Sequence, residues 1–473
     1  MFRAAQRPGP EGGNRRRWLA PAAVILVFIV GFLSGDITAS RHAAQANVVF
    51  GKLKIFGDVL SVIQGSYVEE PDVDNLVQGA IKGMLQTLDP HSSYLTPDML
   101  KQVEVETKGV FGGLGIEIGI KDGILTVIAP IDDTPAFRAG LKAGDKIVKI
   151  ENESTRDMTV TDAVKKLRGE PGTKVTIWIM RDGLGEPRDY TITRDIIKIK
   201  SVKSKAMGDG IAYVKLIQFQ QDSSAELEKA LEAARKEKDG IRGLVLDLRN
   251  NPGGLLDQAV KVADEFIESG LIVYTDGRIE SQKYKYFARK EGTWTGFPIV
   301  VLVNAGSASA SEIVAGALQD HGRAILLGTK SFGKGSVQTI LPLEDGSALR
   351  LTTARYFTPN GRSIQAKGIE PDIVITDGRE PPEGHQSLRE KDIERHLKGE
   401  GEGDGDAAAK PDEGAAAPKK PTRGGGAEGK KEGAPSATGP REDDKDPQLE
   451  RAVELLKGWE LFKTRYVDKP KAS

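Results

Sequence analysis

The chain of 473 residues contains no cysteine and only five histidines. The absence of cysteine excludes a disulfide framework, a thiolate nucleophile, an iron–sulfur cluster and a cysteine zinc site. So few histidines argue against a histidine-rich metal site, and we expect neither a metal nor another cofactor. The chain has 67 lysines and arginines against 68 aspartates and glutamates. A net charge near zero argues against a protein built mainly to bind nucleic acid.

One segment near the N-terminus has the pattern of a membrane-inserting sequence. The basic cluster Arg15–Arg17 precedes an apolar run from Trp18 to Leu33, whose length lies between a secretion signal and the roughly 20 residues of a spanning helix. A small-x-small site at Ala44–Ala46 lies farther downstream than cleavage usually requires. We therefore predict a signal or membrane anchor over residues 1–46, favour the anchor, and keep a buried core helix as the alternative. The rest of the chain is then expected in the periplasm or another extracytoplasmic space, with an anchor in the cytoplasmic membrane.

Three units follow this segment and together predict an α/β multidomain fold. Residues 47–105 form a helical N-terminal segment, because their apolar residues recur at helical spacing. Residues 106–195 contain short β-like runs and predict a β-rich domain. Residues 196–376 alternate apolar strands with helical stretches. That alternation is typical of an α/β core with a largely parallel, covered sheet.

The C-terminal part of the sequence predicts a linker and a helix. Residues 377–446 are mostly Gly, Pro, Ala, Lys and Glu, with no Phe, Tyr or Trp. Such a segment cannot bury enough apolar surface to offset its chain entropy, so we predict a disordered linker. Residues 447–473 carry apolar side chains at helical spacing and predict an amphipathic helix. This helix docks on the body of the chain or on a second subunit, and we expect a homo-oligomer.

A glycine turn runs directly into a strand at residues 112–118, GGLGIEI. The backbone N–H groups of such a turn can bind the terminal carboxylate of a peptide that pairs with the strand. A plain hairpin turn is the structural alternative. A dinucleotide-binding loop is a weaker one, because no strand precedes the glycines and no helix follows them.

The stretch from Asp133 to Ile147, DTPAFRAGLKAGDKI, lies downstream of this glycine turn. The two segments together make the region resemble a PDZ domain over about 90 residues. The resemblance implies a carboxylate-binding loop formed by Gly113, Leu114, Gly115 and Ile116. Leu114 and Ile116 are then expected to line an apolar pocket for the last side chain of the peptide.

The second candidate site is a serine cluster at residues 304–313, NAGSASASEI, between an apolar strand and a helix. A serine at such a turn can expose its oxygen, and the helix N-terminus stabilises developing negative charge. A purely structural alternative is a capping box formed by Ser309 and Glu312.

A catalytic serine needs a base, and histidine is the usual one. His321 has no visible orienting partner, and no G-x-S-x-G motif is present. A lysine can act instead if burial lowers its pKa, which points to Lys334 in residues 332–335, FGKG. Residues 328–334 also fit the first part of a P-loop, but Gly335 replaces the magnesium-binding Ser or Thr and a strand is predicted next. An exposed lysine in a glycine turn is the remaining alternative.

A third motif, DLRNNPGG at residues 247–254, follows a strong predicted strand. Its glycines offer backbone N–H groups as oxyanion donors, although a bare β-to-α turn has a similar sequence. Taken in order, the three motifs resemble the carboxyl-terminal processing (tail-specific) protease family. The resemblance extends from the helical segment near residue 50 to about Asp372.

The resemblance to this family implies roles for individual residues. Ser309 is expected to be the nucleophile and Lys334 the general base, with Gln338 orienting or assisting the lysine. Asp320 matches an auxiliary aspartate at the end of the serine helix, and Arg168 matches an arginine that signals substrate occupancy. The oxyanion donors are expected to be the backbone N–H groups of two further residues, Gly253 and Ala310.

These inferences predict a serine endopeptidase with a Ser/Lys dyad. Its PDZ-like domain captures protein substrates by their apolar C-termini, and an adaptor protein is a further expected partner. The alternative is a non-catalytic PDZ adaptor that holds envelope proteins by their C-termini, and a P-loop NTPase is a third hypothesis.

Overall fold

The computed structural model describes residues 50–181, 183, 185–376, 388–399 and 446–463. Its contacts divide the chain into two units, residues 1–81 and residues 82–473. In the first unit a helix covers residues 50–66, and α2 (Val73–Gln86) begins there and ends in the second unit. The signal or anchor predicted at residues 1–46 lies outside the described residues. Within the described ranges, no helix is long and apolar enough to cross a membrane.

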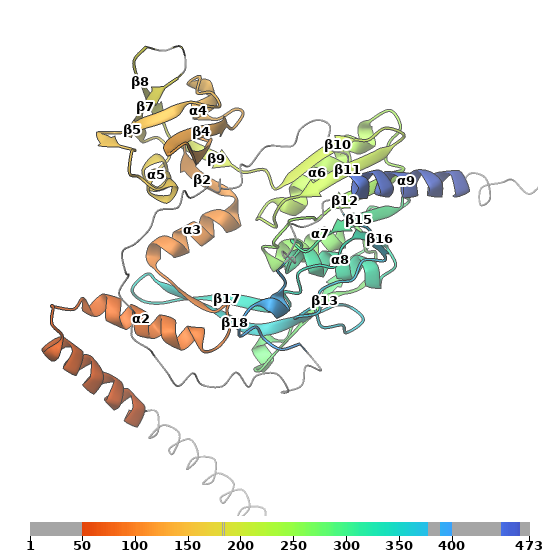
Figure 1. Cartoon of the computed structure of the whole chain (residues 1–473). Coiled ribbons are helices and arrows are strands. Elements are labelled where there is room, and N and C mark those ends of the chain that lie inside the picture. The colour runs from red at the N-terminus through yellow and green to blue at the C-terminus, as the bar shows by residue number, and fades with distance from the viewer. Residues whose placement is uncertain (1–49, 182, 184, 377–387, 400–445, 464–473) are drawn as a thin grey trace, which may run out of the picture. The chain divides into compact units, whose positions relative to one another are not determined.

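The β-rich domain follows β1 (Ser93–Leu95) and α3 (Pro97–Lys108). Its elements are β2 (Val110–Gly113), β3 (Ile116–Lys121), β4 (Ile124–Pro130), α4 (Pro135–Arg138), β5 (Lys146–Ile150), β6 (Glu153–Ser154), α5 (Val160–Leu167), β7 (Lys174–Met180), β8 (Arg188–Thr193) and β9 (Asp195–Lys198). The main sheet has the order β3-β4-β5-β7-β8, which leaves β3 at an edge, and β2 pairs with β9. Strands β4, β5, β7 and β8 of this sheet are labelled in Figure 1. Alternate side chains of β7, Val175, Ile177 and Ile179, are buried in the core of the domain. Strand β9, which pairs with β2, ends at residue 198, three residues after the predicted end of the domain at residue 195.

The region that follows the β-rich domain contains a six-stranded sheet in the order β10-β11-β12-β15-β16-β19. These strands are β10 (Val202–Ala206), β11 (Ile211–Leu216), β12 (Gly243–Asp247), β15 (Ile299–Val303), β16 (Ala324–Gly328) and β19 (Ile373–Val374). All neighbouring pairs from β11 to β19 are parallel, and β10 is antiparallel to β11. The predicted largely parallel sheet is confirmed. Its central strands are fully buried because helices cover both faces.

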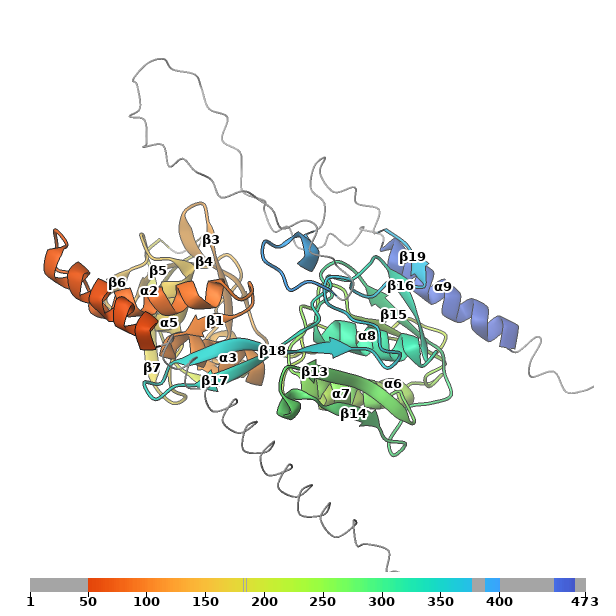
Figure 2. The same ribbon diagram turned by 90° about the horizontal axis from the view of Figure 1, so that it is seen from below.

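Alternate residues of these strands enter two different cores. Leu244, Leu246 and Val301 pack with α6 (Ser223–Lys236), α7 (Leu256–Asp264) and α8 (Ala310–Asp320). Val245, Val300 and Leu302 face the other way and pack against Leu449, Ala452 and Leu456 of α9 (Pro447–Phe462). Figure 2 shows β15 and β16 between α8 and α9. The C-terminal helix therefore docks on the body of its own chain.

A second, antiparallel sheet has the order β1-β18-β13-β14, and β17 pairs with β18. Its other strands are β13 (Gly270–Gly277), β14 (Lys285–Ala288), β17 (Ser336–Pro342) and β18 (Ala348–Phe357), with the short helix η1 (Glu280–Gln282) between β13 and β14. The hairpin of β17 and β18 is visible in Figure 2. No pattern in the sequence predicted this sheet. Strand β17 confirms the strand predicted after Lys334, and a strand in this position contradicts the P-loop, which opens a helix.

Residues 388–399 lie inside the segment predicted to be disordered, yet the structure describes them as packed. They contain the short helix η2 (Glu390–Asp392), and the side chain of Glu390 is fully buried. The prediction of disorder from residue 377 to residue 446 is therefore wrong for these twelve residues. The composition indicated disorder because the apolar residues of this segment, Leu388, Ile393 and Leu397, are few among many charged residues.

Candidate active site

The three sequence motifs follow three adjacent strands of the parallel sheet. The loop containing Gly253 follows β12, the loop containing Ser309 follows β15, and the loop containing Lys334 follows β16. Because these strands are parallel neighbours, their carboxyl ends lie at one edge of the sheet, where α/β proteins bind ligands. The topology therefore brings the three loops together.

Ser309 has the backbone conformation of a strained residue. Its φ is 54° and its ψ is −111°, a region that side chains other than glycine rarely adopt. The serine is half-buried directly before α8, and its hydroxyl makes no capping hydrogen bond to that helix. The strain holds Ser309 at the tip of the turn between β15 and α8. Such strain is found at nucleophiles on strand-to-helix turns.

The carboxylate of Glu312 joins the serine loop to the lysine loop. One oxygen, Oε2, accepts the backbone N–H of Ser309 at 2.8 Å and that of Lys334 at 2.9 Å. The other oxygen accepts the N–H of Gly333 at 2.7 Å and the hydroxyl of Ser331 at 2.5 Å. Glu312 is fully buried, and burial raises its pKa to about 7 against the lowering effect of these four donors. The proposed capping interaction of Glu312 with the Ser309 N–H is present, and it also positions Lys334.

Lys334 is half-buried in a glycine-rich loop beside four charged groups. Burial lowers the pKa of its ammonium, and the positive charge of Arg350 acts in the same direction. Glu390, Glu312 and Asp89 raise the pKa, but the net effect is a lowered value. Burial thus increases the population of the neutral amine, the form that can accept a proton.

Gln338 lies on β17 at a β-bulge between Val337 and Gln338. Its side-chain amide donates to the hydroxyl of Ser336 at 2.9 Å and to the hydroxyl of Thr352 at 3.4 Å. The structure therefore places Gln338 in a hydrogen-bonded group on the hairpin that begins just after Lys334.

Asp320 and His321 lie at the opposite end of α8 from Ser309. Eleven residues separate Ser309 from Asp320, which corresponds to about 16 Å along a helix. Asp320 accepts hydrogen bonds from the Arg362 side chain and, at 2.9 Å, from the Asn360 N–H. His321 Nε2 lies 2.7 Å from the carbonyl oxygen of Leu271. Neither residue is brought to Ser309, which fits the exclusion of His321 as a base.

The two expected oxyanion donors flank Ser309. A Cβ placed on Gly253 would lie 2.9 Å from Ser309 Cβ and 3.0 Å from Ala310 N, so the two loops touch. Ala310 opens α8, where an N–H has no intrahelical acceptor. Gly253 differs from the expectation, because its N–H donates to Asn251 Oδ1 at 2.9 Å. In this conformation that N–H is already paired within its own loop.

The glycine loop of the β-rich domain connects β2 to β3. Gly115 has a φ of 77°, and Leu114 is 2% exposed within the core of the domain. Leu114 therefore does not line an open pocket here, and the half-buried Ile116 is the member of the pair closer to solvent. Arg168 ends α5, and its guanidinium carbon lies 4.3 Å from the ring centroid of Phe111 beside this loop.

Several residues at the site were missed from the sequence. Glu390 and His91 contact each other beside the lysine loop, although Glu390 belongs to the segment predicted to be disordered. Arg249 of the third motif donates to Asp446 at 2.8 Å, and Asp446 caps the N-terminus of α9. Arg249 is part of the third motif, so the sequence could have indicated that it matters, but its partner Asp446 lies 197 residues away.

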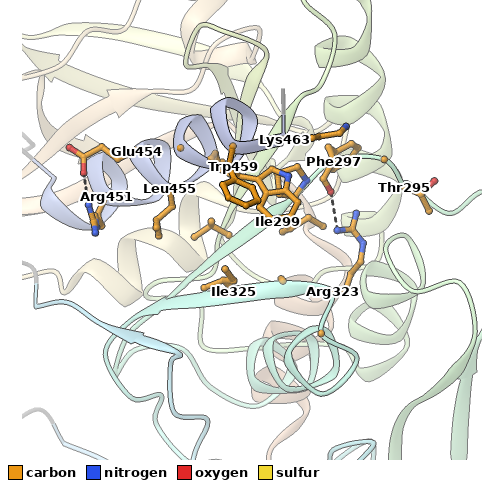
Figure 3. Close-up of a pocket in the computed structure, with 18 of the residues that line it drawn as sticks. Thr295, Phe297, Ile299, Arg323, Ile325, Arg451, Glu454, Leu455, Trp459 and Lys463 are labelled. Atoms are coloured by element: carbon orange, nitrogen blue, oxygen red, sulfur yellow. Dashed lines mark hydrogen bonds and ion pairs between the residues drawn. The ribbon is translucent and has the colours of Figure 1, made fainter. Parts of the chain in front are cut away.

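A cavity of about 840 Å³ lies elsewhere on the sheet (Figure 3). It is lined by Trp459 and Leu455 of α9 and by Ile299 and Ile325 near the starts of β15 and β16. These are the amino ends of the strands, opposite the three motifs. In the described part of the chain, no group of three His, Asp or Glu residues is arranged to hold a metal ion.

Comparison with known proteins identifies three families whose models match parts of this chain. Residues 210–375 match the model of peptidase family S41, residues 126–181 match the PDZ domain, and residues 34–99 match the N-terminal domain of the activating protease CtpB. The chain is 43% identical over 445 residues to a carboxy-terminal-processing protease of Bartonella bacilliformis, covering 92% of this chain and 96% of that one.

This chain belongs to the carboxy-terminal-processing proteases of peptidase family S41. It is a serine-type peptidase, and its β-rich region is a PDZ domain. Another member, the carboxy-terminal processing protease CtpA of Bacillus subtilis, is 37% identical over 357 residues, which cover 74% of each chain. A solved photosystem II D1 C-terminal processing protease is 30% identical, with a TM-score of 0.40, and the match covers 68% of this chain and 92% of that one.

Proposed function

We propose that this carboxy-terminal-processing protease is an endopeptidase with Ser309 as nucleophile and Lys334 as general base. The observation that carries the proposal is Glu312, because one of its oxygens accepts the N–H groups of both residues. This shared acceptor fixes the two loops relative to each other. The lowered pKa of Lys334 and the strained backbone of Ser309 support the same assignment.

The proposed reaction is acyl transfer through a covalent intermediate. Lys334 Nζ takes the proton of the Ser309 hydroxyl as Oγ attacks the substrate carbonyl. The developing oxyanion lies at the N-terminus of α8, where the N–H of Ala310 donates to it. Gly253 adds a second donor when substrate displaces its bond to Asn251. The lysine then protonates the leaving amine, and a water molecule hydrolyses the acyl-enzyme.

The proposed substrates are proteins with apolar C-termini. Strand β3 is an edge strand of the PDZ sheet, so an extended peptide can pair with it while its carboxylate binds the glycine loop at Gly113–Ile116. Arg168 beside this loop is the proposed reporter of peptide binding. We place the enzyme in the periplasm or another extracytoplasmic space, held by residues 1–46. We propose that it forms a homo-oligomer, and an adaptor protein is a further candidate partner.

Replacement of the two catalytic groups tests the proposal. Ser309→Ala and Lys334→Ala are compared with the parent and with Lys330→Ala, a neighbouring lysine that pairs with Glu370 at 2.6 Å. We expect cleavage of an unfolded protein substrate to fall to background in the first two variants and to persist in the third. Parental cleavage by either of the first two variants would refute the dyad. No cleavage by the parent, combined with binding of C-terminal peptides, would instead favour a PDZ adaptor.

A further inference from the structure

The loop containing Lys334 is held from two sides by two buried glutamates. Glu312 holds one side through the backbone N–H groups of Gly333 and Lys334. Glu390 lies on the other side, in the post-core segment (residues 388–399), and is also fully buried. This segment lies beyond residues 210–375, which match the peptidase family model, so the match gives Glu390 no role.

Two contacts connect Glu390 to the lysine loop. Its backbone N–H donates to the carbonyl oxygen of Phe332 at 3.1 Å. Its carboxylate accepts the side-chain amide of Gln365 at 3.0 Å, and the oxygen of that amide accepts the N–H of Gly335 at 3.0 Å. The residues two before and one after Lys334 are therefore tied to Glu390, directly or through Gln365.

The carboxylate of Glu390 is in turn fixed by His91. The Nε2 atom of His91 lies 2.9 and 2.8 Å from its two oxygens. Burial raises the pKa of Glu390, but the bonds from His91 and Gln365 and the charges of His91 and Lys334 hold it below its usual value. The group is therefore a buried carboxylate anion near the candidate base. A buried charge of this kind persists only where partners compensate for it.

We propose that Glu390 is a positioning residue for Lys334, so that the post-core segment is an integral part of the active site. The inference rests on the proposed Ser/Lys mechanism. Glu390 acts in two ways, by holding the loop through Phe332 and Gln365 and by placing a negative charge near the Lys334 ammonium.

The charges around Lys334 come from four separate elements. They are Glu312 on α8, Arg350 on β18, Asp89 in the loop before β1, and Glu390 in the post-core segment. Of the charged groups that act on Lys334, Glu390 has the largest effect on its pKa, and it favours the ammonium form. Removal of its charge therefore lowers the pKa of Lys334 further. This effect separates a positioning role from a merely structural one.

The test compares Glu390→Gln with Glu394→Gln, an exposed acid four residues along the same segment. In the full chain we expect E390Q to lower kcat by roughly 10- to 100-fold, since small misplacements of a catalytic group are costly. The rising limb of its pH–rate profile should move to lower pH, so that the ratio of parental to variant rate decreases toward acid pH. E394Q should match the parent in both respects.

Gln365→Met provides a second variant that keeps the charge of Glu390 but removes the bridge to Gly335. We expect a lower kcat without the acid shift of the pH profile. Unchanged rate and profile in folded E390Q, with activity still dependent on Ser309 and Lys334, would overturn the inference alone. Activity that survives Ser309→Ala and Lys334→Ala would instead overturn the proposed mechanism on which it rests. A reduced rate with an unshifted profile in both E390Q and Q365M would leave Glu390 only a structural role and reject the positioning one.

Discussion

Each end of helix α8 carries an acidic residue, Glu312 or Asp320, and lies beside a glycine, Gly253 or Gly322. The two ends differ in the hydrogen bonds that the acid accepts. At the N-terminal end, Glu312 is fully buried and accepts hydrogen bonds from two separate loops. At the C-terminal end, Asp320 accepts from one turn, at Asn360 and Arg362. Arg362 retains 44% side-chain exposure.

The N-terminal end of α8 is suited to catalysis, whereas the C-terminal end stabilises the fold. The N-terminal end has backbone N–H groups without acceptors inside the helix and a positive dipole, which suit a reaction that develops negative charge. The C-terminal end has neither feature, and its acid connects the helix to a surface turn. The following variants test whether function is confined to the first end.

The largest effect is expected from Gly253→Ala beside the N-terminal end. Gly253 has a φ of 104°, and an added Cβ would lie 2.8 Å from the Ala308 carbonyl oxygen and 2.9 Å from Ser309 Cβ. We expect kcat to fall roughly 10²- to 10³-fold, the loss associated with an oxyanion donor. The matched control is Gly322→Ala at the other end, where φ is 60° and nothing lies within 4 Å. Steady-state kinetics of both proteins check the prediction, and equal losses would contradict the comparison.

Glu312→Gln should have the next largest effect. The amide must turn an NH₂ group toward N–H donors that now meet a carboxylate oxygen, so buried donors lose their acceptor. We expect a loss of about 2 kcal/mol or more in the free energy of unfolding, at about 1–3 kcal/mol for each unsatisfied group. We also expect a roughly 10- to 100-fold lower kcat, because Ser309 and Lys334 lose their common anchor. Denaturant unfolding and kinetics on the same preparation measure the two effects.

The pH dependence should separate activity from stability. Activity should rise with pH, by up to about tenfold per unit below the pKa of Lys334, because the neutral amine is the base. Glu312 has a folded pKa of about 7, above its usual value of 4.5, so the folded state binds its proton more tightly. Its contribution to stability is full below about 4.5 and is lost as pH rises through about 7. Thermal unfolding across this range should show the trend in the parent and not in E312Q.

Asp320→Asn should have the smallest effect. It is the same acid-to-amide change at the C-terminal end, and it weakens the pairing with Arg362 while leaving an acceptor for the Asn360 N–H. We expect a loss of about 1 kcal/mol, because the arginine is partly exposed. We expect kcat to stay within about twofold of the parental value, because Asp320 lies at the opposite end of α8 from Ser309. A loss of activity as large as that of E312Q would give Asp320 the auxiliary role that the family resemblance implies.

The sequence was most informative where a site is built from adjacent residues. The glycine loop at residues 113–116 and the turn at Ser309 could be predicted from the sequence, because each combines residues with a special backbone conformation and the boundary of a strand. The strands of the parallel sheet were visible because their apolar runs are continuous.

Contacts between distant segments could not be predicted in this way. Neither His91 nor Glu390 has a local pattern that indicates the other, because 299 residues separate them. The Asn251 side chain that pairs with the Gly253 N–H is a neighbour in sequence, but only the folded loop shows its orientation. The antiparallel sheet was missed for the same reason, since β1 and β18 pair across more than 250 residues.

The order of the domains, the three motifs and the absence of thiol chemistry all follow from the sequence alone. Those properties depend on residue type, local spacing and the alternation of strands and helices. The environment of Lys334 depends instead on tertiary contacts, because it comes from Glu312, Arg350, Asp89 and Glu390 on four separate elements. The pKa of a buried lysine depends on burial and on charges brought near by folding, and the neighbouring residues in the sequence indicate neither.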